Sequence, residues 1–185
     1  MSKRHVQRMR DARKMICPMA EESRSRRHHW LRLGFVIAIA VADQISKYVA
    51  LRHLELHRPV PLFPTLDLML TYNTGAAFSF LSDAGGWQRW LFVGLAIAIS
   101  AFLLKWLFTL YARERWLGSA LVLVLGGAIG NLIDRLFRDG KVVDFIYFHY
   151  QDFHFPAFNL ADSAICVGAA LLIAHTLFVP ESASS

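Results

Sequence analysis

The chain has 185 residues, of which 55% are hydrophobic and only 18% are charged. This length suits one domain and excludes a soluble enzyme joined to a separate membrane anchor. The balance of apolar over charged residues also excludes an ordinary soluble domain and indicates a membrane protein.

Four stretches have the length and apolarity of membrane-spanning helices, which need roughly 20 residues each. We expect them at residues 30–51, 90–111, 116–135 and 161–179. Lys105 can extend its stem to the headgroups, and Pro180 stops the fourth stretch. The sequence predicts a mainly α membrane fold with one four-helix domain, residues 30–180, and a short tail, residues 181–185.

The net charge of +6 is concentrated before the first span, since half of the twenty Lys and Arg residues precede or enter it. Lys105, Arg113 and Arg115 flank the connection between the second and third spans. Cytoplasmic flanks of spanning helices are rich in Lys and Arg. We therefore expect both termini and this connection in the cytoplasm.

The basic extension, residues 1–29, lacks the interleaved aromatic residues of a nucleic-acid-binding segment, so we expect no nucleic acid as partner. It is expected to be a flexible arm or a helix on the inner membrane surface. An A-x-A pattern at residues 40–42 resembles a signal-peptide cleavage site. Cleavage there would remove half of the first span, which disfavours that interpretation.

The segment between the first two spans is predicted to form a small β hairpin or sheet at the outer surface. Three prolines between residues 59 and 64 exclude a regular helix. Apolar and polar residues alternate from Leu66 to Asn73, which is typical of a strand. A turn is expected at residues 73–75, with apolar alternation resuming at Phe78 and Phe80.

The connection between the third and fourth spans is predicted to be an aromatic loop at the membrane interface, where such rings are favoured. Its aromatic residues are Phe137, Phe145, Tyr147, Phe148, Tyr150, Phe153, Phe155 and Phe158.

Polar side chains within spans are costly, so each indicates a functional site. With the expected topology, the carboxylates and amides of the spans, with two cations, fall at the outer ends of three spans or in the adjoining loop, while the inner halves are almost purely apolar. They are Asp43, Gln44, Lys47, Asn131, Asp134, Arg135, Asp144, Asn159 and Asp162.

Several of these residues also have structural interpretations. Asp43 and Lys47 are spaced i, i+4 with the acid first, which favours an ion pair that supports the fold. Asp134 could orient Arg135, which could reach lipid phosphate or an acidic substrate group. Asn159 and Asp162 suit a helix N-cap and an acid in its first turn.

Asp144 is harder to explain structurally, because it interrupts the apolar run at residues 142–146 with no cap to form. Two carboxyl groups brought together in a low-dielectric site share a proton. The ionised one can activate water while the protonated one polarises a peptide carbonyl. Asp144 and Asp162 are the candidates for such an aspartic protease pair.

Other chemistries find less support in the sequence. H-E-x-x-H and G-x-S-x-G motifs are absent, and the eight histidines show no zinc-site spacing. A proton-coupled transporter using Asp43, Lys47 and Asp134 would need polar residues on both sides of the midplane. An intramembrane aspartyl protease of the presenilin or prepilin peptidase kind would carry G-x-G-D, whereas Asp144 follows Lys141-Val142-Val143.

Five motifs, in order, resemble those of the lipoprotein signal peptidase family, also called signal peptidase II. The resemblance runs from about residue 34 to residue 178. The motifs are Asp43-Gln44-Ile45-Ser46-Lys47, Asn73-Thr74-Gly75-Ala76-Ala77-Phe78, the segment Gly126 to Arg135, Val142-Val143-Asp144-Phe145-Ile146, and Phe158-Asn159-Leu160-Ala161-Asp162-Ser163.

The resemblance implies an aspartic endopeptidase of the bacterial inner membrane, acting as a monomer near the outer face. Its substrates would be diacylglyceryl-modified prolipoproteins, cut just before the lipidated cysteine, in contact with membrane lipid and with no metal or organic cofactor. Asp144 and Asp162 match the catalytic positions. Positions that line or shape the site are matched by Asn73, Asn131, Arg135, Asn159, Asp43, Lys47 and Asp134.

Overall fold

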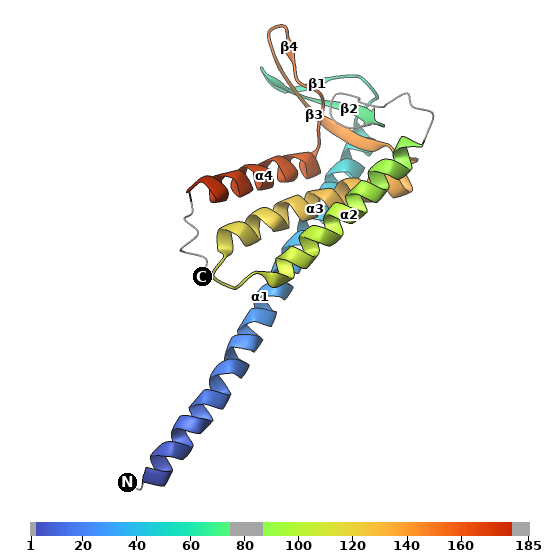
Figure 1. The fold of residues 1–185 in the computed structure, drawn as a ribbon. Coiled ribbons are helices and arrows are strands. Elements are labelled where there is room, and N and C mark those ends of the chain that lie inside the picture. Colours follow the sequence, from blue (N-terminus) through green and yellow to red (C-terminus); the bar gives the residue numbers. More distant parts are fainter. Residues whose placement is uncertain (1–2, 75–86, 179–185) are drawn as a thin grey trace.

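Four long helices form the frame of the protein in the computed structural model, which describes residues 3–74 and 87–178 (Figure 1). They are α1 (Lys3–His53), α2 (Gln88–Thr109), α3 (Arg115–Phe137) and α4 (Leu160–Phe178). The segments long and apolar enough to cross a membrane are Arg27–His53, Arg89–Thr109, Arg115–Phe137 and Leu160–Phe178. The prediction of a mainly helical fold with four such helices is confirmed.

Helix α1 is 51 residues long and includes most of the basic extension. At 1.5 Å per residue, a helix of this length measures about 75 Å, more than twice the thickness of the hydrocarbon layer. Only its second half can therefore lie within a bilayer.

Helix α3 lies at the centre and packs against α1, α2 and α4. Its glycines allow close approach, and Gly126 and Gly130 form a G-x-x-x-G, a spacing typical of close helix packing. A Cβ on Gly126 would lie 2.8 Å from Ile39 of α1, and one on Gly168 of α4 would lie 2.8 Å from the carbonyl oxygen of Ala120. The polar ends of the helices are brought together by this tight packing.

A hydrophobic core joins α1, α2 and α3 at the end of the bundle that includes the α2–α3 connection. It is formed by Val36, Leu103, Leu107, Leu110, Leu121, Val122 and Leu125. Burial of such side chains contributes about 1.5–3 kcal/mol each relative to water.

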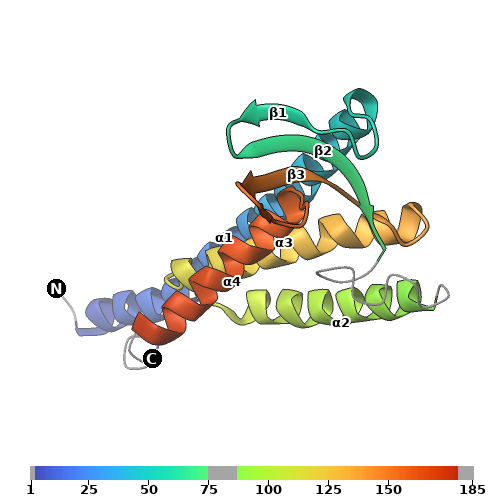
Figure 2. The same cartoon turned by 90° about the horizontal axis from the view of Figure 1, so that it is seen from above.

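A four-stranded antiparallel sheet lies at the other end of the helices (Figures 1 and 2). Its order is β1 (Val60–Phe63), β2 (Leu66–Asn73), β3 (Val142–Tyr150) and β4 (Phe153–His154). The predicted strand at residues 66–73 is thus present. The connection predicted as an aromatic loop forms strands over much of its length, because β3 pairs with β2 and β4 pairs with β3. The expected apolar alternation at Phe78 and Phe80 lies outside the described residues.

Two pairings of β3 position the polar residues. Asp144 lies opposite Thr71, and Val142 lies opposite Asn73, at the end of β2. Just beyond Asp144, Ile146 and Phe158 exchange backbone hydrogen bonds of 2.8 and 3.0 Å. Since Phe158 is two residues before Leu160, this bridge places the first turn of α4 beside Asp144.

Candidate active site

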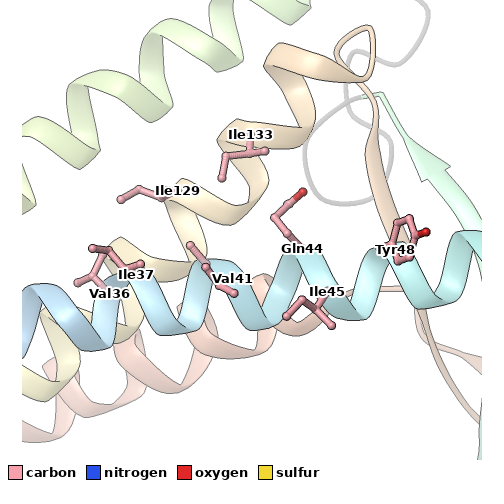
Figure 3. Close-up of a pocket in the computed structure, with 9 residues that line it drawn as sticks. Val36, Ile37, Val41, Gln44, Ile45, Tyr48, Ile129 and Ile133 are labelled. Atoms are coloured by element: carbon pink, nitrogen blue, oxygen red, sulfur yellow. The ribbon is translucent and has the colours of Figure 1, made fainter.

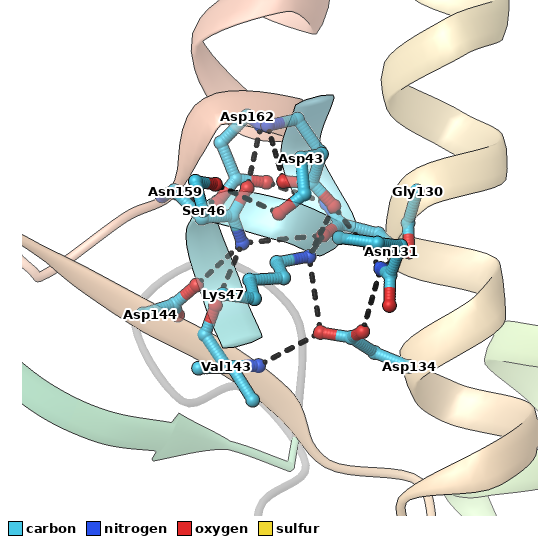
Figure 4. Close-up of polar contacts among 12 residues, drawn as sticks. Asp43, Ser46, Lys47, Gly130, Asn131, Asp134, Val143, Asp144, Asn159 and Asp162 are labelled. Carbon is cyan, nitrogen blue, oxygen red and sulfur yellow. Dashed lines mark hydrogen bonds and ion pairs between the residues drawn. The ribbon is translucent and has the colours of Figure 1, made fainter. Parts of the chain in front are cut away.

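Polar residues from α1, α3, β3 and the start of α4 converge at the sheet end of the helices (Figure 4). Six of them are buried: Asp43, Lys47, Asn131, Asp134, Asp144 and Asn159. Buried charges must be paired and hydrogen-bonded to be tolerated, so the partners of each residue define the site.

Lys47 is the central cation of the cluster. Its Nζ lies 2.8 Å from Asp43 Oδ2 and 3.0 Å from Asp134 Oδ2, and all three side chains are fully buried. The same ammonium donates to Asn131 Oδ1 at 2.9 Å. The i, i+4 pair expected within α1 is present, and the second carboxylate makes it a link between α1 and α3.

Asp43 also ties α1 to α4, because its Oδ1 accepts a 2.9 Å hydrogen bond from the backbone N–H of Ala161. Gly130 of α3 makes room for this carboxylate, since a Cβ there would lie 2.7 Å from Asp43 Oδ2.

Asp134 is held by partners that sequence reasoning did not assign. Its Oδ2 accepts the backbone N–H of Val143 at 3.0 Å, and its Oδ1 accepts a 2.9 Å hydrogen bond from Gln44. Arg138 forms an ion pair with the same Oδ1. Asp134 thus anchors β3 to the helices. It also interacts electrostatically with Arg135, and the suggested orientation of that side chain by Asp134 stays a prediction.

Two asparagines connect the lysine cluster to the two candidate catalytic carboxyl groups. Asn131, which accepts from Lys47, donates from Nδ2 to Asp162 Oδ1 at 2.7 Å. Asn159 donates from Nδ2 to Asp144 Oδ1 at 2.6 Å and lies 3.2 Å from Asn131 Oδ1. The asparagines therefore fix the positions of both acids relative to Lys47.

Asp162 occupies the third position of α4 and forms a reciprocal cap with Asn159. Its backbone N–H donates to Asn159 Oδ1 at 2.9 Å, while the backbone N–H of Asn159 donates to Asp162 Oδ2 at 3.2 Å. This is the capping arrangement expected from the sequence. It does not occupy Asp162 fully, because Oδ1 faces Asn131 and the side chain stays partly exposed.

Asp144 has the opposite environment, with 1% of its surface exposed. Burial, assisted by the negative charge of Asp162, raises the pKa of Asp144 to about 7. Hydrogen bonds from Asn159 and Asn73 and the charge of Lys47 act in the other direction without cancelling the effect. A carboxyl group with this pKa carries its proton over most of the range below neutrality.

Arg135 lies half-buried, with its guanidinium 5.5 Å from the ring centre of Phe92 in α2. It interacts electrostatically with Asp162 and Asp144 as well as Asp134. Four carboxyl groups thus share the site with three cations, Lys47, Arg135 and Arg138.

An apolar groove of about 440 Å³ runs along α1 and α3 from Val36 to Tyr48 and passes Gln44, beside the polar cluster (Figure 3). Val41 and Ile45 of α1 and Ile129 and Ile133 of α3 are among its walls. The amide of Gln44 donates to Asp134 and to the carbonyl oxygen of Gly130. The groove therefore offers an apolar surface that leads to the site.

The arrangement suits acid–base chemistry, because Asn131 and Asn159 hold Asp162 and Asp144, the latter with a raised pKa, in one site. Among residues 27–74 and 87–178, no three His, Cys, Asp or Glu side chains are grouped to hold a metal ion.

Comparison with known proteins identifies this architecture. Residues 35–178 match the family described as signal peptidase (SPase) II. The lipoprotein signal peptidase of Acinetobacter baylyi is 50% identical over 83% of this chain and 86% of its own length. That of Coxiella burnetii is 48% identical over 83% of this chain and 93% of its own.

Two solved structures are similar to this chain in both fold and sequence. One bacterial membrane enzyme, determined by the in meso method at 2.3 Å resolution, superimposes with a TM-score of 0.71 at 28% identity, covering 80% of this chain and 87% of the other. A second, at 1.9 Å, gives 0.69 at 29% identity, covering 81% and 94%. With a family match that covers most of its length and relatives at about 50% identity, the chain belongs to the signal peptidase II family.

Proposed function

We propose that this membrane peptidase, whose family removes signal peptides from lipoproteins, uses Asp144 and Asp162 as its catalytic pair. The observation that carries the assignment is their joint attachment to Asn159. The Asn159 side chain donates to Asp144 at 2.6 Å, and its backbone N–H donates to Asp162 at 3.2 Å. Two acids from a strand and a helix thereby face the same site.

The different environments of the two acids assign their roles. Asp162, ionised at the start of α4, accepts a proton from water as the water oxygen attacks the scissile carbonyl carbon. Asp144, protonated in its buried position, donates its proton to the carbonyl oxygen. When the intermediate collapses, the proton on Asp162 passes to the leaving amine, and Asp144 recovers its proton from the hydroxyl group. Both carboxyl groups thereby return to their initial protonation states.

The other site residues frame this pair. Asn131 and Asn159 orient the two acids, and Lys47 balances the structural carboxylates Asp43 and Asp134. Asn73 forms a hydrogen bond with Asp144, and Arg135 is available to stabilise negative charge that develops on the substrate.

Conversion of either acid to its amide tests the assignment. Asp144→Asn and Asp162→Asn should each lower cleavage of a purified diacylglyceryl prolipoprotein by at least about a hundredfold, because neither amide can transfer the proton. Binding of the substrate should persist. Asp139→Asn is the matched control, since Asp139 is an exposed carboxylate outside the cluster. Substantial cleavage by either active-site variant contradicts the assignment.

We also propose that cleavage occurs on the N-terminal side of the lipidated cysteine and depends on the lipid. A diacylglyceryl group holds its cysteine at headgroup depth in the bilayer, next to a signal helix within the hydrocarbon. The polar cluster, at the sheet end of the apolar helices, suits that depth. Incubation with a prolipoprotein before and after diacylglyceryl transfer should give the product size shift only after transfer. Equal cleavage of both forms argues for a general membrane peptidase.

The proposed setting is the bacterial inner membrane, with residues 30–180 as the peptidase domain, residues 1–29 as a basic cytoplasmic extension and the active site near the outer face. The basic residues before the first span and around the α2–α3 connection support this orientation. A reporter enzyme that is active only in the cytoplasm should be active when fused to the C-terminus, whereas one that is active only outside the cytoplasm should be inactive there. We propose a monomer, for which one copy per detergent micelle by light scattering is the expected result.

A further inference from the structure

A second groove lies far from the active site, near the α2–α3 connection. It has a volume of about 500 Å³ and lies between the first turns of the α1 span and of α3. Its walls include Arg32, Phe35 and Ile39 of α1 and Arg115, Gly118 and Leu123 of α3. Arg32 precedes Asp43 by eleven residues on α1, so about 16 Å of helix separates this groove from the polar cluster.

The outer rim of this groove is cationic. Arg32 is fixed there, because its guanidinium donates to the carbonyl oxygens of Leu110, Tyr111 and Glu114 at 3.3, 2.9 and 3.3 Å. These contacts hold the side chain in place without neutralising its charge. Gly118 leaves the space for it, since a Cβ there would lie 2.8 Å from the guanidinium.

Arg115, whose side chain is exposed, adds a second positive charge to the rim. Within the described stretches 27–35 and 105–119, Glu114 is the one acidic residue. Its carboxylate accepts the backbone N–H of Tyr111 at 2.6 Å and interacts electrostatically with Arg32, which leaves Arg115 as the rim's uncompensated charge. The rim is therefore complementary to a negatively charged group.

The groove continues as an apolar channel toward the opposite end of the helices. A neighbouring groove of about 420 Å³ shares Phe35, Ile39 and Leu123 with it and reaches Ala42 of α1 and Leu160 of α4. From Arg32 to Ala42 the helix rises about 15 Å. This length matches much of a phospholipid acyl chain.

We propose that these connected grooves bind an anionic diacyl phospholipid, with its phosphate at Arg115 and Arg32 and one acyl chain along Phe35, Ile39 and Leu123. Juxtaposed positive charge and apolar surface at headgroup depth favour such a lipid. The signal peptide of the substrate is a poorer occupant, because its n-region is positively charged. Placement of this lipid in the inner leaflet rests on the orientation proposed above, whereas its binding to the grooves does not depend on that orientation.

Lipid binding to the delipidated full-length protein in detergent tests the proposal. Native mass spectrometry would be used to titrate phosphatidylglycerol against phosphatidylcholine with identical acyl chains. We expect about tenfold preference for phosphatidylglycerol. Arg115→Ala should weaken its binding about fivefold, as expected for one lost charge contact. Arg113→Ala is the charge-matched control, since Arg113 lies on the same connection, over the Tyr111 ring, outside the groove walls.

Leu123→Trp fills the channel without changing charge and should also weaken phosphatidylglycerol binding. If Arg115→Ala and Arg113→Ala weaken phosphatidylglycerol binding equally, the preference comes from the general surface charge, and the proposed site is overturned. Equal binding of both lipids by the wild-type chain would overturn it without any variant. Prolipoprotein cleavage, measured in parallel, reports separately on the proposed catalytic pair.

Discussion

At the scale of single residues, the proposed chemistry rests on the contrast between two carboxyl groups. Asp162 caps α4 and accepts hydrogen bonds from Asn131 and Asn159, whereas Asp144 is enclosed between strand and helix. The burial that raises the pKa of Asp144 to about 7 supplies the proton that the proposed mechanism needs.

Cleavage should therefore decline on the alkaline side of neutrality. Above pH 7 Asp144 loses its proton, so kcat/KM for a diacylglyceryl prolipoprotein should fall about tenfold per pH unit, with an apparent pKa near 7. Initial rates between pH 5 and 9 measure this limb. A profile that rises or stays level up to pH 9 would exclude protonated Asp144 as the acid.

Stability should respond to the same group. The folded-state pKa of Asp144, about 7, lies above the ordinary aspartate value of 3.8. Its contribution to stability is complete below pH 3.8 and is lost as pH rises through 7. Asp144→Asn removes the buried charge, so the variant should unfold a few degrees higher than wild type at pH 8, with a smaller difference at pH 5. Thermal unfolding in detergent checks this, and a variant less stable at pH 8 would be the contrary result.

At the scale of elements, local and long-range contacts differ in how well the sequence predicts them. The Asp43–Lys47 pair and the Asn159–Asp162 cap lie within one helical turn, and both follow from spacing. Arg138 also lies four residues after Asp134, so the same rule would have found that pair. Arg138 nevertheless lies beyond the end of the expected span, at residue 135, so the pair is not among the contacts expected within spans.

Contacts between elements could not be derived in this way. Gln44 reaches Asp134 from another helix, and Asn159 reaches Asp144 only because Phe158 pairs with Ile146. Such pairings depend on the register of β3, which turn signals and alternation do not fix. The sequence indicated which residues gather at one end of the spans, while packing determines which of them touch.

The close contact of α3 with Asp43 gives a prediction at this scale. Gly130→Ala places a methyl group 2.7 Å from Asp43 Oδ2, so it should displace the buried ion pair and destabilise the fold by about 1–3 kcal/mol. Gly94→Ala in α2 is the matched control, since a Cβ there meets nothing within 4 Å and improves helix propensity. Thermal unfolding of both variants in the same detergent should shift in opposite directions. Equal shifts would argue against the steric explanation.

At the scale of the whole molecule, the fold separates a polar reaction site from the apolar helices that position it in the membrane. Lys47 and Asp134 join α1, α3 and β3 at the sheet end, while the apolar core joins α1, α2 and α3 at the other. The 440 Å³ groove along α1 and α3 leads to Gln44 at the edge of the polar cluster. A membrane-bound substrate could approach the catalytic pair along this surface without leaving the bilayer.

Filling that groove should therefore impair substrate binding more than chemistry. Val41 is half exposed and lines the groove, so Val41→Trp should raise KM for a diacylglyceryl prolipoprotein about fivefold, the equivalent of about 1 kcal/mol of lost contact, with little change in kcat. Ile97→Trp is the control, because Ile97 is similarly exposed on α2 outside the groove walls. Steady-state kinetics in mixed micelles would separate the two parameters. Unchanged KM in the Val41 variant would exclude the groove as the route, and a fall in kcat alone would instead place the disturbance at the carboxyl pair.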